Sequence, residues 1–181
     1  AVAGAGVGVA FVGLDAFRDA PEVAETGLSF EENALLKARA IAESTGLTAI
    51  ADDSGLAVDV LGGMPGIFSA RWAGSHGNDT ANLQLVLAQL SDVADGHRGA
   101  AFVCAAAVAH PRGDEQIVRG ELRGRLTREP RGTNGFGYDP IFCPDGETRT
   151  TAQMEPHEKD AISHRGLAFR ALAGHWGTAA T

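Results

Sequence analysis

The sequence has 181 residues, of which 44% are hydrophobic and 21% are charged, as is typical of one globular domain with a core of its own. Its formal net charge of −8 argues against broad binding to a nucleic-acid backbone, which requires a basic surface. No apolar run approaches the roughly 20 residues that a membrane-spanning helix needs, and the first residues lack the positive segment of a signal peptide. We therefore expect a single domain over residues 1–181 that partners neither a nucleic-acid polymer nor a membrane.

Two residue types are scarce, and their positions are informative. Cys104 and Cys143 each lie inside an apolar run, without the Cys/His spacing of a structural zinc site. We predict that both are buried, reduced thiols, which fits a cytoplasmic protein. Only two lysines occur, Lys37 and Lys159, so either one is a candidate for a specific role.

Hydrophobic periodicity and turn residues predict alternating strands and helices along the first half of the chain. Ser29 begins a Ser-x-x-Glu capping box with Glu32, and Gly46 fits the position just past a helix end. In chain order we predict a strand over 7–12, a helix over 30–45, short strands over 47–51 and 56–60, a turn over 61–66 and a helix over 78–90.

The second half is predicted to contain an antiparallel hairpin. Alanine in the apolar run 100–110 would permit a helix, but a Pro-Arg-Gly-Asp turn follows, and the next segment, 115–126, alternates. We therefore predict a β-hairpin of these two segments, followed by a mostly irregular loop over 130–140, a strand over 141–143 and a helical segment over 156–173. Together these elements predict an α/β fold in which helices cover the faces of a mixed sheet.

Asp52 and Asp53 are adjacent carboxylates at the end of an apolar segment, and Ser54 and Gly55 follow them directly. Neighbouring side chains of a strand leave on opposite faces, so we predict that the two acids do not act as a close pair. One of them is expected to face a site, while the other faces solvent or orients the turn. A plain turn is the alternative, because Asp, Ser and Gly are common turn residues.

The segment PRGTNGFGYDP, 130–140, combines glycines with two aromatic residues and an aspartate. Glycine lets a backbone approach a ligand closely, and Phe136 and Tyr138 could stack on a planar base. Asp139, or backbone groups of the loop, could then bind the polar edges of that base. The alternative is a glycine-rich loop whose aromatic side chains fill the core.

The segment EKDAISHR holds Lys159, His164 and Arg165 beside a helix. Cations and helix amide ends are how proteins hold phosphate. If Ser163 caps a helix that restarts there, His164 and Arg165 fall in its first turn, where an anion would offset their unfavourable position. A solvated basic surface is the alternative.

The loop before the first helix carries acids, including Glu22 and Glu25. Carboxylates near an aspartate suggest Mg²⁺ held through waters and phosphate oxygens, although acidic loops are usually just solvated. The four clusters together describe a nucleotide site: an acid for metal and base chemistry, an aromatic loop for the nucleobase and cations for the phosphates.

Four blocks, ETGLSFEENALLKA, ADDSGLAVDVLGGMPGIFSARWAG, PRGTNGFGYDPIF and EKDAISHR, occur in this order. Through them the chain resembles the non-canonical purine nucleoside triphosphate pyrophosphatases, the inosine/xanthosine triphosphate pyrophosphatase family, over residues from about 7 to 173. The resemblance implies an elongated, twisted mixed sheet flanked by helices, a homodimer, and Mg²⁺ as cofactor. It also implies cleavage of ITP, dITP or XTP to the monophosphate and pyrophosphate, which removes deaminated purines from the nucleotide pool.

The resemblance further implies roles for individual residues. Asp53, the second acid of the Asp-Asp-Ser-Gly block, would be the proton acceptor and a metal ligand, and Glu25 would be the second metal carboxylate. The positions matching the family's substrate-binding residues are Ser54, Phe136, Gly137, Tyr138, Asp139, Lys159, His164 and Arg165. Because Asp53 takes the catalytic role, Asp52 would only orient neighbouring groups of the site.

The sequence departs from the family's pattern at its start. The family begins with a strand and a Ser/Thr-x-Asn-x-x-Lys loop that grips the triphosphate, and no such motif occurs here. The leading alternative is therefore a catalytically impaired fragment that binds triphosphate poorly; equal turnover of ITP after restoring an upstream segment would refute it. A third hypothesis is another metal-dependent phosphohydrolase with an aspartyl nucleophile, which would release orthophosphate instead of pyrophosphate.

Overall fold

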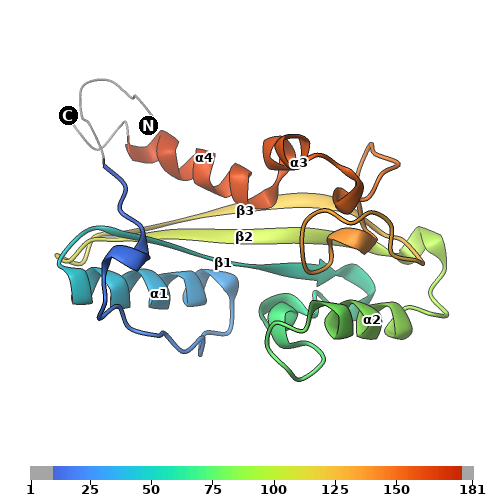
Figure 1. Ribbon diagram of the computed structural model, residues 1–181, viewed down its shortest axis with the longest axis horizontal. Helices are drawn as coiled ribbons and strands as arrows, with labels where there is room; N and C mark the ends of the chain where they lie inside the picture. The colour runs from blue at the N-terminus through green and yellow to red at the C-terminus, as the bar shows by residue number, and fades with distance from the viewer. Residues whose placement is uncertain (1–9, 177–181) are drawn as a thin grey trace.

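The computed structural model describes residues 10–176, and its centre is one antiparallel sheet with the strand order β1-β2-β3-β4 (Figure 1). The strands are β1 (Ala49–Val58), β2 (Gly99–Ala109), β3 (Glu115–Leu126) and β4 (Phe142–Pro144). The helices are α1 (Phe30–Thr45), α2 (Asp79–Gln89), α3 (Pro156–Ile162) and α4 (His164–Trp176). Short 3-10 helices are η1 (Leu14–Ala16), η2 (Asp59–Leu61), η3 (Gly66–Arg71), η4 (Asp95–His97), η5 (Asp139–Ile141) and η6 (Thr151–Gln153).

Helix α1 has the predicted bounds because local capping determines both of its ends. The Ser29 hydroxyl accepts a hydrogen bond from the Glu32 amide at 3.1 Å, which pairs one of the free amides of the first turn. Gly46 ends the helix with a φ of 69°, a left-handed conformation that favours glycine.

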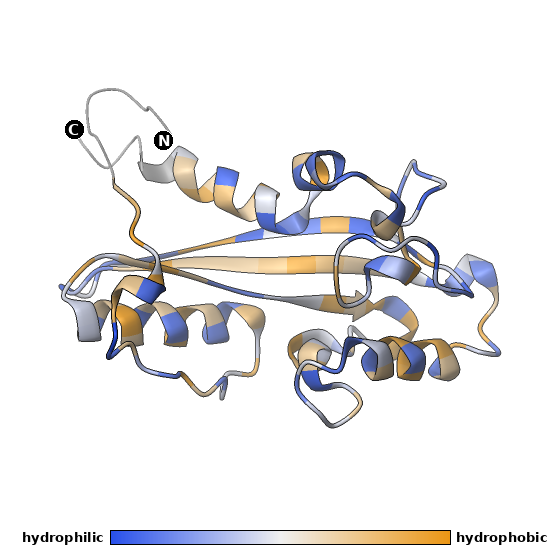
Figure 2. Cartoon of the chain, viewed as in Figure 1, coloured by the Kyte–Doolittle hydropathy of each residue, from blue (hydrophilic) through white to orange (hydrophobic). Residues whose placement is uncertain are grey.

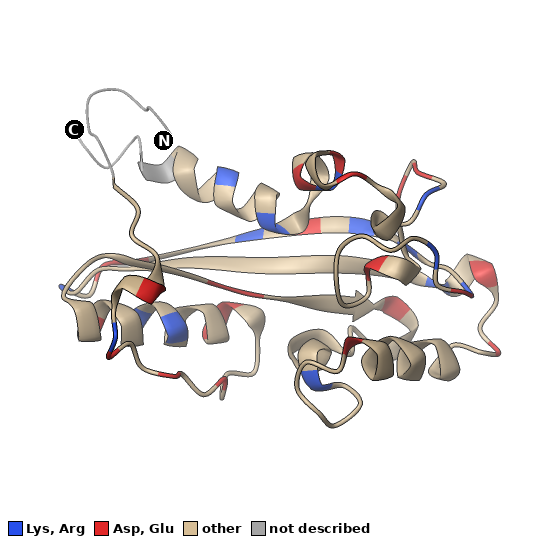
Figure 3. Ribbon diagram, in the orientation of Figure 1, with Lys and Arg blue, Asp and Glu red and all other residues tan. Residues whose placement is uncertain are grey.

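Strand β2 is the centre of the sheet, and it is buried on both faces. The predicted hairpin is confirmed, since β2 pairs antiparallel with β3 from Ala109 opposite Glu115 to Gly99 opposite Arg125. Its side chains are mostly alanine and contain no charge, as Figure 2 and Figure 3 show along the strand. Small side chains let a helix approach each face closely, which explains how an alanine-rich segment serves as a central strand.

The two faces of the sheet carry different helices. Alternate β2 residues, among them Ala101, Val103 and Ala105, pack with Ala34 and Ala38 of α1. The intervening ones, Cys104, Ala106 and Val108, pack with Ala168 and Leu172 of α4 on the opposite face. A third cluster at the other end of the sheet joins α2 to β1, β2 and the 138–142 segment. Both cysteines are buried and free, as predicted.

Strand β1 corrects the prediction of two short strands separated by a turn. It is continuous from Ala49 to Val58, and every residue in it, including Asp52 and Asp53, pairs with β2. Gly55 lies where the backbone of η3 crosses the strand, since a Cβ there would come within 2.5 Å of the Gly66 carbonyl oxygen. The Asp-Asp-Ser-Gly segment is therefore mid-strand, and the simple turn is excluded.

Three further predictions differ in part from the observed fold. The pairs among the described strands are all antiparallel, so the parallel component of the predicted mixed sheet is not found there. Of the strand predicted over 7–12, residues 7–9 lie outside the described part, and 10–12 have no regular structure. The helical segment over 156–173 is interrupted at Ser163, whose hydroxyl accepts a hydrogen bond from the Gly166 amide at 3.0 Å and caps α4.

Within residues 10–176, none of the helices combines the length and the hydrophobicity needed to cross a membrane.

Candidate active site

Asp53 lies in the middle of β1, on the face of the sheet that α1 covers, and is 8% exposed. Its carboxylate accepts hydrogen bonds from the Asn33 amide at 3.2 Å and from the Lys37 ammonium at 3.1 Å. Asn33 and Lys37 are four residues apart on α1, so their side chains lie on one face of the helix. The Asn33 side chain is oriented by the Gly27 amide, which donates to its oxygen at 2.8 Å.

Glu25 reaches the same place from the irregular segment before α1. Its Oε1 accepts a hydrogen bond from Lys37 Nζ at 2.9 Å, and its Oε2 lies 3.5 Å from Arg71 Nη1 at the end of η3. Lys37 therefore bridges the two carboxylates that the sequence proposed as metal ligands. The structure places Glu25 and Asp53 in one cluster, as that prediction requires.

Asn33, Lys37 and Arg71 were given no role from the sequence. A signal for two of them existed, because Lys37 is one of only two lysines and Asn33 precedes it by one helical turn. Arg71 had no such signal, since it is one of thirteen arginines and its approach to Glu25 depends on how η3 crosses β1.

The electrostatics of this cluster favour a proton acceptor. Burial raises the pKa of Asp53, although the charge and hydrogen bond of Lys37 oppose part of the shift. For Lys37, burial by itself would lower the pKa, but the contacts with Glu25 and Asp53 outweigh it and the pKa is raised. Lys37 is thus a cation at neutral pH, and Asp53 accepts a proton more readily than an exposed aspartate, as a general base requires.

The donor set is compatible with Mg²⁺. The part of the chain that the structure describes contains no group of three or more His, Cys, Asp or Glu arranged to hold a metal by themselves. Two neighbouring carboxylates, Asp53 and Glu25, are nevertheless the kind of site that holds Mg²⁺ when water and substrate phosphates supply the other ligands.

Asp52 points to the opposite face of β1, as alternation predicted. Its Oδ2 accepts hydrogen bonds from the Ser54 hydroxyl at 2.9 Å and from Arg165 Nε at 3.0 Å, and the Cys104 thiol lies 3.6 Å away. Ser54 therefore shares a face with Asp52 and Arg165, not with Asp53. Arg165, in the first turn of α4, forms an ion pair with Asp52, so Asp52 orients the guanidinium of Arg165.

Asp139 is a buried organiser of the glycine-rich loop, and this corrects its predicted contact with the edge of a base. Its carboxylate accepts hydrogen bonds from the Phe136 amide at 2.9 Å and the Thr151 hydroxyl at 2.8 Å, and it pairs with Lys159. The Lys159 ammonium also lies 5.0 Å from the centre of the Phe136 ring. Asp139 thus fixes the loop and the lysine together, while Phe136 is 67% exposed.

The two aromatic residues of the loop have opposite environments. Tyr138 is buried in the core cluster beside Leu83, and its hydroxyl donates to the Ser69 carbonyl oxygen at 2.8 Å. Only Phe136 is available to stack on a planar ligand, so the prediction that Tyr138 would also stack is wrong for its side chain. Between them, the Gly137 amide donates to the Asp79 carboxylate at the start of α2, at 2.8 Å.

This difference predicts separate effects for two substitutions. Phe136→Ala is expected to weaken binding of a purine nucleotide about 10-fold, with little change in unfolding free energy, because it removes an exposed ring available for stacking. Tyr138→Phe is expected to cost about 1 kcal/mol of unfolding free energy with nucleotide binding retained, because it removes one buried hydrogen bond. Nucleotide titration and urea unfolding of both variants check the pair, and interchanged effects would contradict the assignment.

The structure makes His164 a neutral imidazole. It therefore does not supply the positive charge expected of it in the predicted phosphate-binding group of Lys159, His164 and Arg165. It stacks on Phe102 with the ring centres 5.1 Å apart, and its Nδ1 is buried without a hydrogen-bond partner. Burial, with smaller contributions from Arg165 and Lys159, lowers the pKa of His164 to about 4.

The depressed pKa of His164 predicts a pH-dependent stability. A histidine with an unfolded pKa near 6.5 and a lower folded pKa contributes fully above pH 6.5, and its contribution is lost as the pH falls toward 4. We expect up to about 3 kcal/mol of unfolding free energy to disappear across this range. Urea unfolding at pH 7, 5.5 and 4.5 measures the slope, which should be shallower in His164→Phe than in the original protein; an equal slope in both proteins would contradict the prediction.

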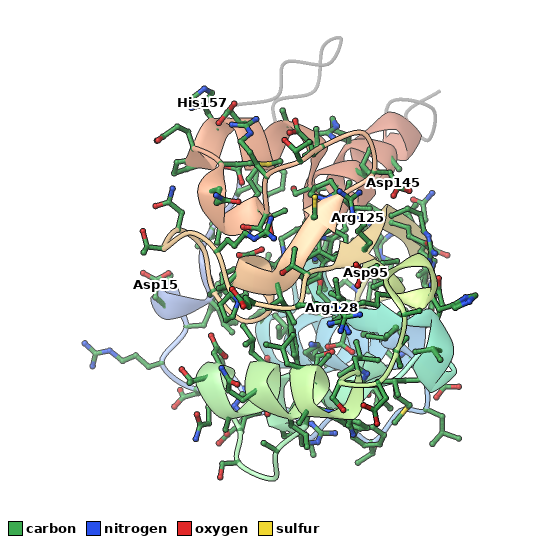
Figure 4. All side chains as sticks on the ribbon, turned by 90° about the vertical axis from the view of Figure 1, so that its right-hand side faces the viewer. Asp15, Asp95, Arg125, Arg128, Asp145 and His157 are labelled. Atoms are coloured by element: carbon green, nitrogen blue, oxygen red, sulfur yellow. The ribbon has the colours of Figure 1, made fainter. Side chains whose placement is uncertain are left out.

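Two hollows open on the surface near these elements. One of about 270 Å³ borders the exposed Phe136 and the first turn of α2. Another of about 410 Å³ lies at the end of the molecule where Figure 4 labels Asp95, Arg125 and Arg128 together. Arg128 is paired there with Asp95 at 2.7 Å, and none of the candidate site residues lines this second hollow. Arg131 of the 130–140 loop borders the second hollow, whereas Phe136 and Gly137 border the first. Of these two hollows, the first therefore adjoins the residues proposed to bind a base.

A sheet covered by helices, with an aspartate, a glutamate and a lysine gathered on one face, is suited to phosphate chemistry. The chain belongs to the Ham1 family, whose sequence model matches residues 3–175. The family predicted from the sequence is confirmed by its relatives. A dITP/XTP pyrophosphatase of Streptomyces avermitilis is 64% identical over 171 residues, which cover 94% of this chain and 86% of the relative.

Solved structures agree with this fold. A nucleoside-triphosphatase / dITP/XTP pyrophosphatase from Mycobacterium abscessus is 57% identical and superposes with a TM-score of 0.79, over 92% of this chain and 84% of that one. The Staphylococcus aureus Ham1 protein is 40% identical, with a TM-score of 0.85 over 91% of this chain and 85% of that one.

Proposed function

We propose that this protein hydrolyses the non-canonical purine nucleoside triphosphates ITP, dITP and XTP to the monophosphate and pyrophosphate, and so cleanses the nucleotide pool. The observation that carries the proposal is the Asp53–Lys37–Glu25 cluster, in a chain 64% identical to a dITP/XTP pyrophosphatase. Relatives from Streptomyces coelicolor and Mycobacterium tuberculosis with the same name are 64% and 56% identical.

Asp53 is the proposed proton acceptor. Hydrolysis requires water to attack a phosphorus atom and to lose a proton, and the raised pKa of a partly buried carboxylate suits that step. Lys37 keeps Asp53 in place through a 3.1 Å hydrogen bond and offsets negative charge on the phosphates. Asn33 fixes the second carboxylate oxygen, which leaves the base in a defined orientation.

Mg²⁺ is the proposed cofactor, held by Asp53 and Glu25. When bound, it would supply positive charge to the phosphate oxygens and to the leaving pyrophosphate. The two roles proposed for Asp53, metal ligand and base, use the same carboxylate.

The remaining predicted residues are proposed to bind the nucleotide from the other side of β1. Phe136 offers an exposed ring for the purine, and Lys159 lies over that ring while paired with Asp139. Arg165, half-exposed beside Asp52, offers a cation. Ser54, Tyr138, Asp139 and His164 take part by holding these groups, since their side chains are engaged or internal. Gly137 takes part through its backbone, whose amide is bound to Asp79.

Two further parts of the proposal concern the state of the protein. We propose a homodimer, on the strength of the family resemblance, and a cytoplasmic location, which the two buried free thiols support.

Product analysis tests the function. The protein is incubated with ITP or ATP in the presence of Mg²⁺, and monophosphate, pyrophosphate and orthophosphate are quantified. We expect pyrophosphate from ITP and much less from ATP, because a site built to bind a 6-oxo purine leaves buried polar groups unpaired with a 6-amino purine. Orthophosphate as the first product would support a different phosphohydrolase, and binding of ITP without turnover would support the impaired fragment.

A further inference from the structure

Arg71 ends η3, in the SARWAG block of the sequence, and lies beside the two proposed metal carboxylates. Hydrogen bonds to the core hold the backbone of η3 in place. The Ser69 hydroxyl accepts from the Leu56 amide at 2.9 Å and donates to the Gly66 carbonyl at 2.6 Å, and the Tyr138 hydroxyl binds the Ser69 carbonyl. The backbone next to Arg71 is therefore preorganised toward the site.

Both oxygens of Glu25 are occupied by cations. Lys37 holds Oε1 at 2.9 Å and is also bound to Asp53, whereas Arg71 contacts Oε2 at 3.5 Å. The Arg71 side chain is 33% exposed and that of Lys37 is 22% exposed. A divalent cation that binds Glu25 competes with both of these cations, and the longer and more exposed contact belongs to Arg71.

A displaced Arg71 would stay at the site. Its guanidinium lies 5.3 Å from the centre of the Phe68 ring, a cation–π contact that does not depend on Glu25. The cations predicted from the sequence to hold phosphate, Lys159 and Arg165, are on the other side of β1 and paired with acids. Arginine is well suited to phosphate because its planar fork can donate two parallel hydrogen bonds.

We propose that Arg71 is an additional substrate-binding residue, which leaves Glu25 when a divalent cation binds there and holds the pyrophosphate portion of the substrate. This inference rests on the proposed function and deepens it. It makes phosphate binding on the α1 side of β1 depend on the metal in two ways, through the metal itself and through release of the arginine.

The exchange predicts effects of opposite sign for Arg71→Gln. Mn²⁺, used in place of Mg²⁺ and followed by electron paramagnetic resonance of the free ion, is expected to bind about 3- to 10-fold more tightly, because a competing cation is gone from Glu25. Pyrophosphate, titrated calorimetrically in saturating Mn²⁺, is expected to bind at least about 10-fold more weakly, because a bidentate partner is lost. Arg71→Lys should show both changes to a smaller degree.

Arg123→Gln is the matched control, since Arg123 also pairs with a surface carboxylate, Asp59, but lies outside the site. It should change neither affinity, and circular dichroism should show all variants folded. Unchanged pyrophosphate binding in both Arg71 variants, or weaker pyrophosphate binding without tighter Mn²⁺ binding, would overturn the exchange. Neither titration needs turnover, so a protein that fails to hydrolyse ITP would refute the proposed function and leave the test of Arg71 valid.

Discussion

Asp53→Asn is expected to lower the turnover of ITP at least about 100-fold while leaving the fold intact. The amide cannot accept the proton of the attacking water, and a general base alone contributes about 100- to 10,000-fold. Because the folded-state pKa of Asp53 is raised, its ionised form opposes folding, and any stability from this group exists only at acidic pH and is lost as the pH rises through the folded pKa. The neutral isostere should therefore leave the unfolding free energy at pH 7 unchanged or slightly higher.

Initial rates of pyrophosphate release and urea unfolding at pH 7 measure both effects. Asp59→Asn is the matched control, since Asp59 is an exposed carboxylate just after β1 that pairs with Arg123. It should retain turnover. The rate of the original protein should also fall as the pH drops through the raised pKa of Asp53. Turnover within 10-fold of the original in Asp53→Asn would exclude Asp53 as the base.

Lys37→Met is expected to reduce turnover at least about 100-fold and also to destabilise the fold. Lys37 is the shared partner of Asp53 and Glu25, and its loss removes the ion pair of Asp53 and leaves Glu25 with the longer Arg71 contact. Breaking charged hydrogen bonds at a partly buried site should cost about 1–3 kcal/mol of unfolding free energy. The loss in turnover follows because Asp53 is no longer held in position and phosphate charge is no longer offset.

A double-mutant cycle separates this cost from a general effect on α1. In the Asp53→Asn background, Lys37→Met should cost at least about 1 kcal/mol less, because the buried negative charge is already removed. Arg39→Met, on the same helix and paired with the Glu115 side chain at the surface, should cost less than about 1 kcal/mol in either background. Equal costs of Lys37→Met in both backgrounds would show that the two side chains are not coupled.

The elements predicted correctly are those whose information is local. Ser29, Glu32 and Gly46 determine the two ends of α1 within a few residues of chain, and the alternating segment 115–126 identifies β3. The opposite directions of Asp52 and Asp53 follow from the two-residue period of a strand, whatever packs around it. Family membership, too, depends on blocks of sequence that can be recognised without coordinates.

Other features depend on partners distant in the chain. The two short strands predicted around Asp52 form one strand, because β2 pairs with every residue from Ala49 to Val58. Local residue preferences contain no information on such long-range pairing. A turn was therefore a plausible alternative for the Asp-Asp-Ser-Gly segment, because its residues are common in turns.

The sequence by itself thus determined the family, the main helices and hairpin, and the residues that deserve study. Only the tertiary structure decided what each of them contacts. It buried Tyr138 and made His164 neutral, since burial depends on the elements packed over a residue. It also brought Lys37 and Arg71 to Glu25, because the approach of α1 and η3 to β1 depends on the packing of surfaces far apart in the chain.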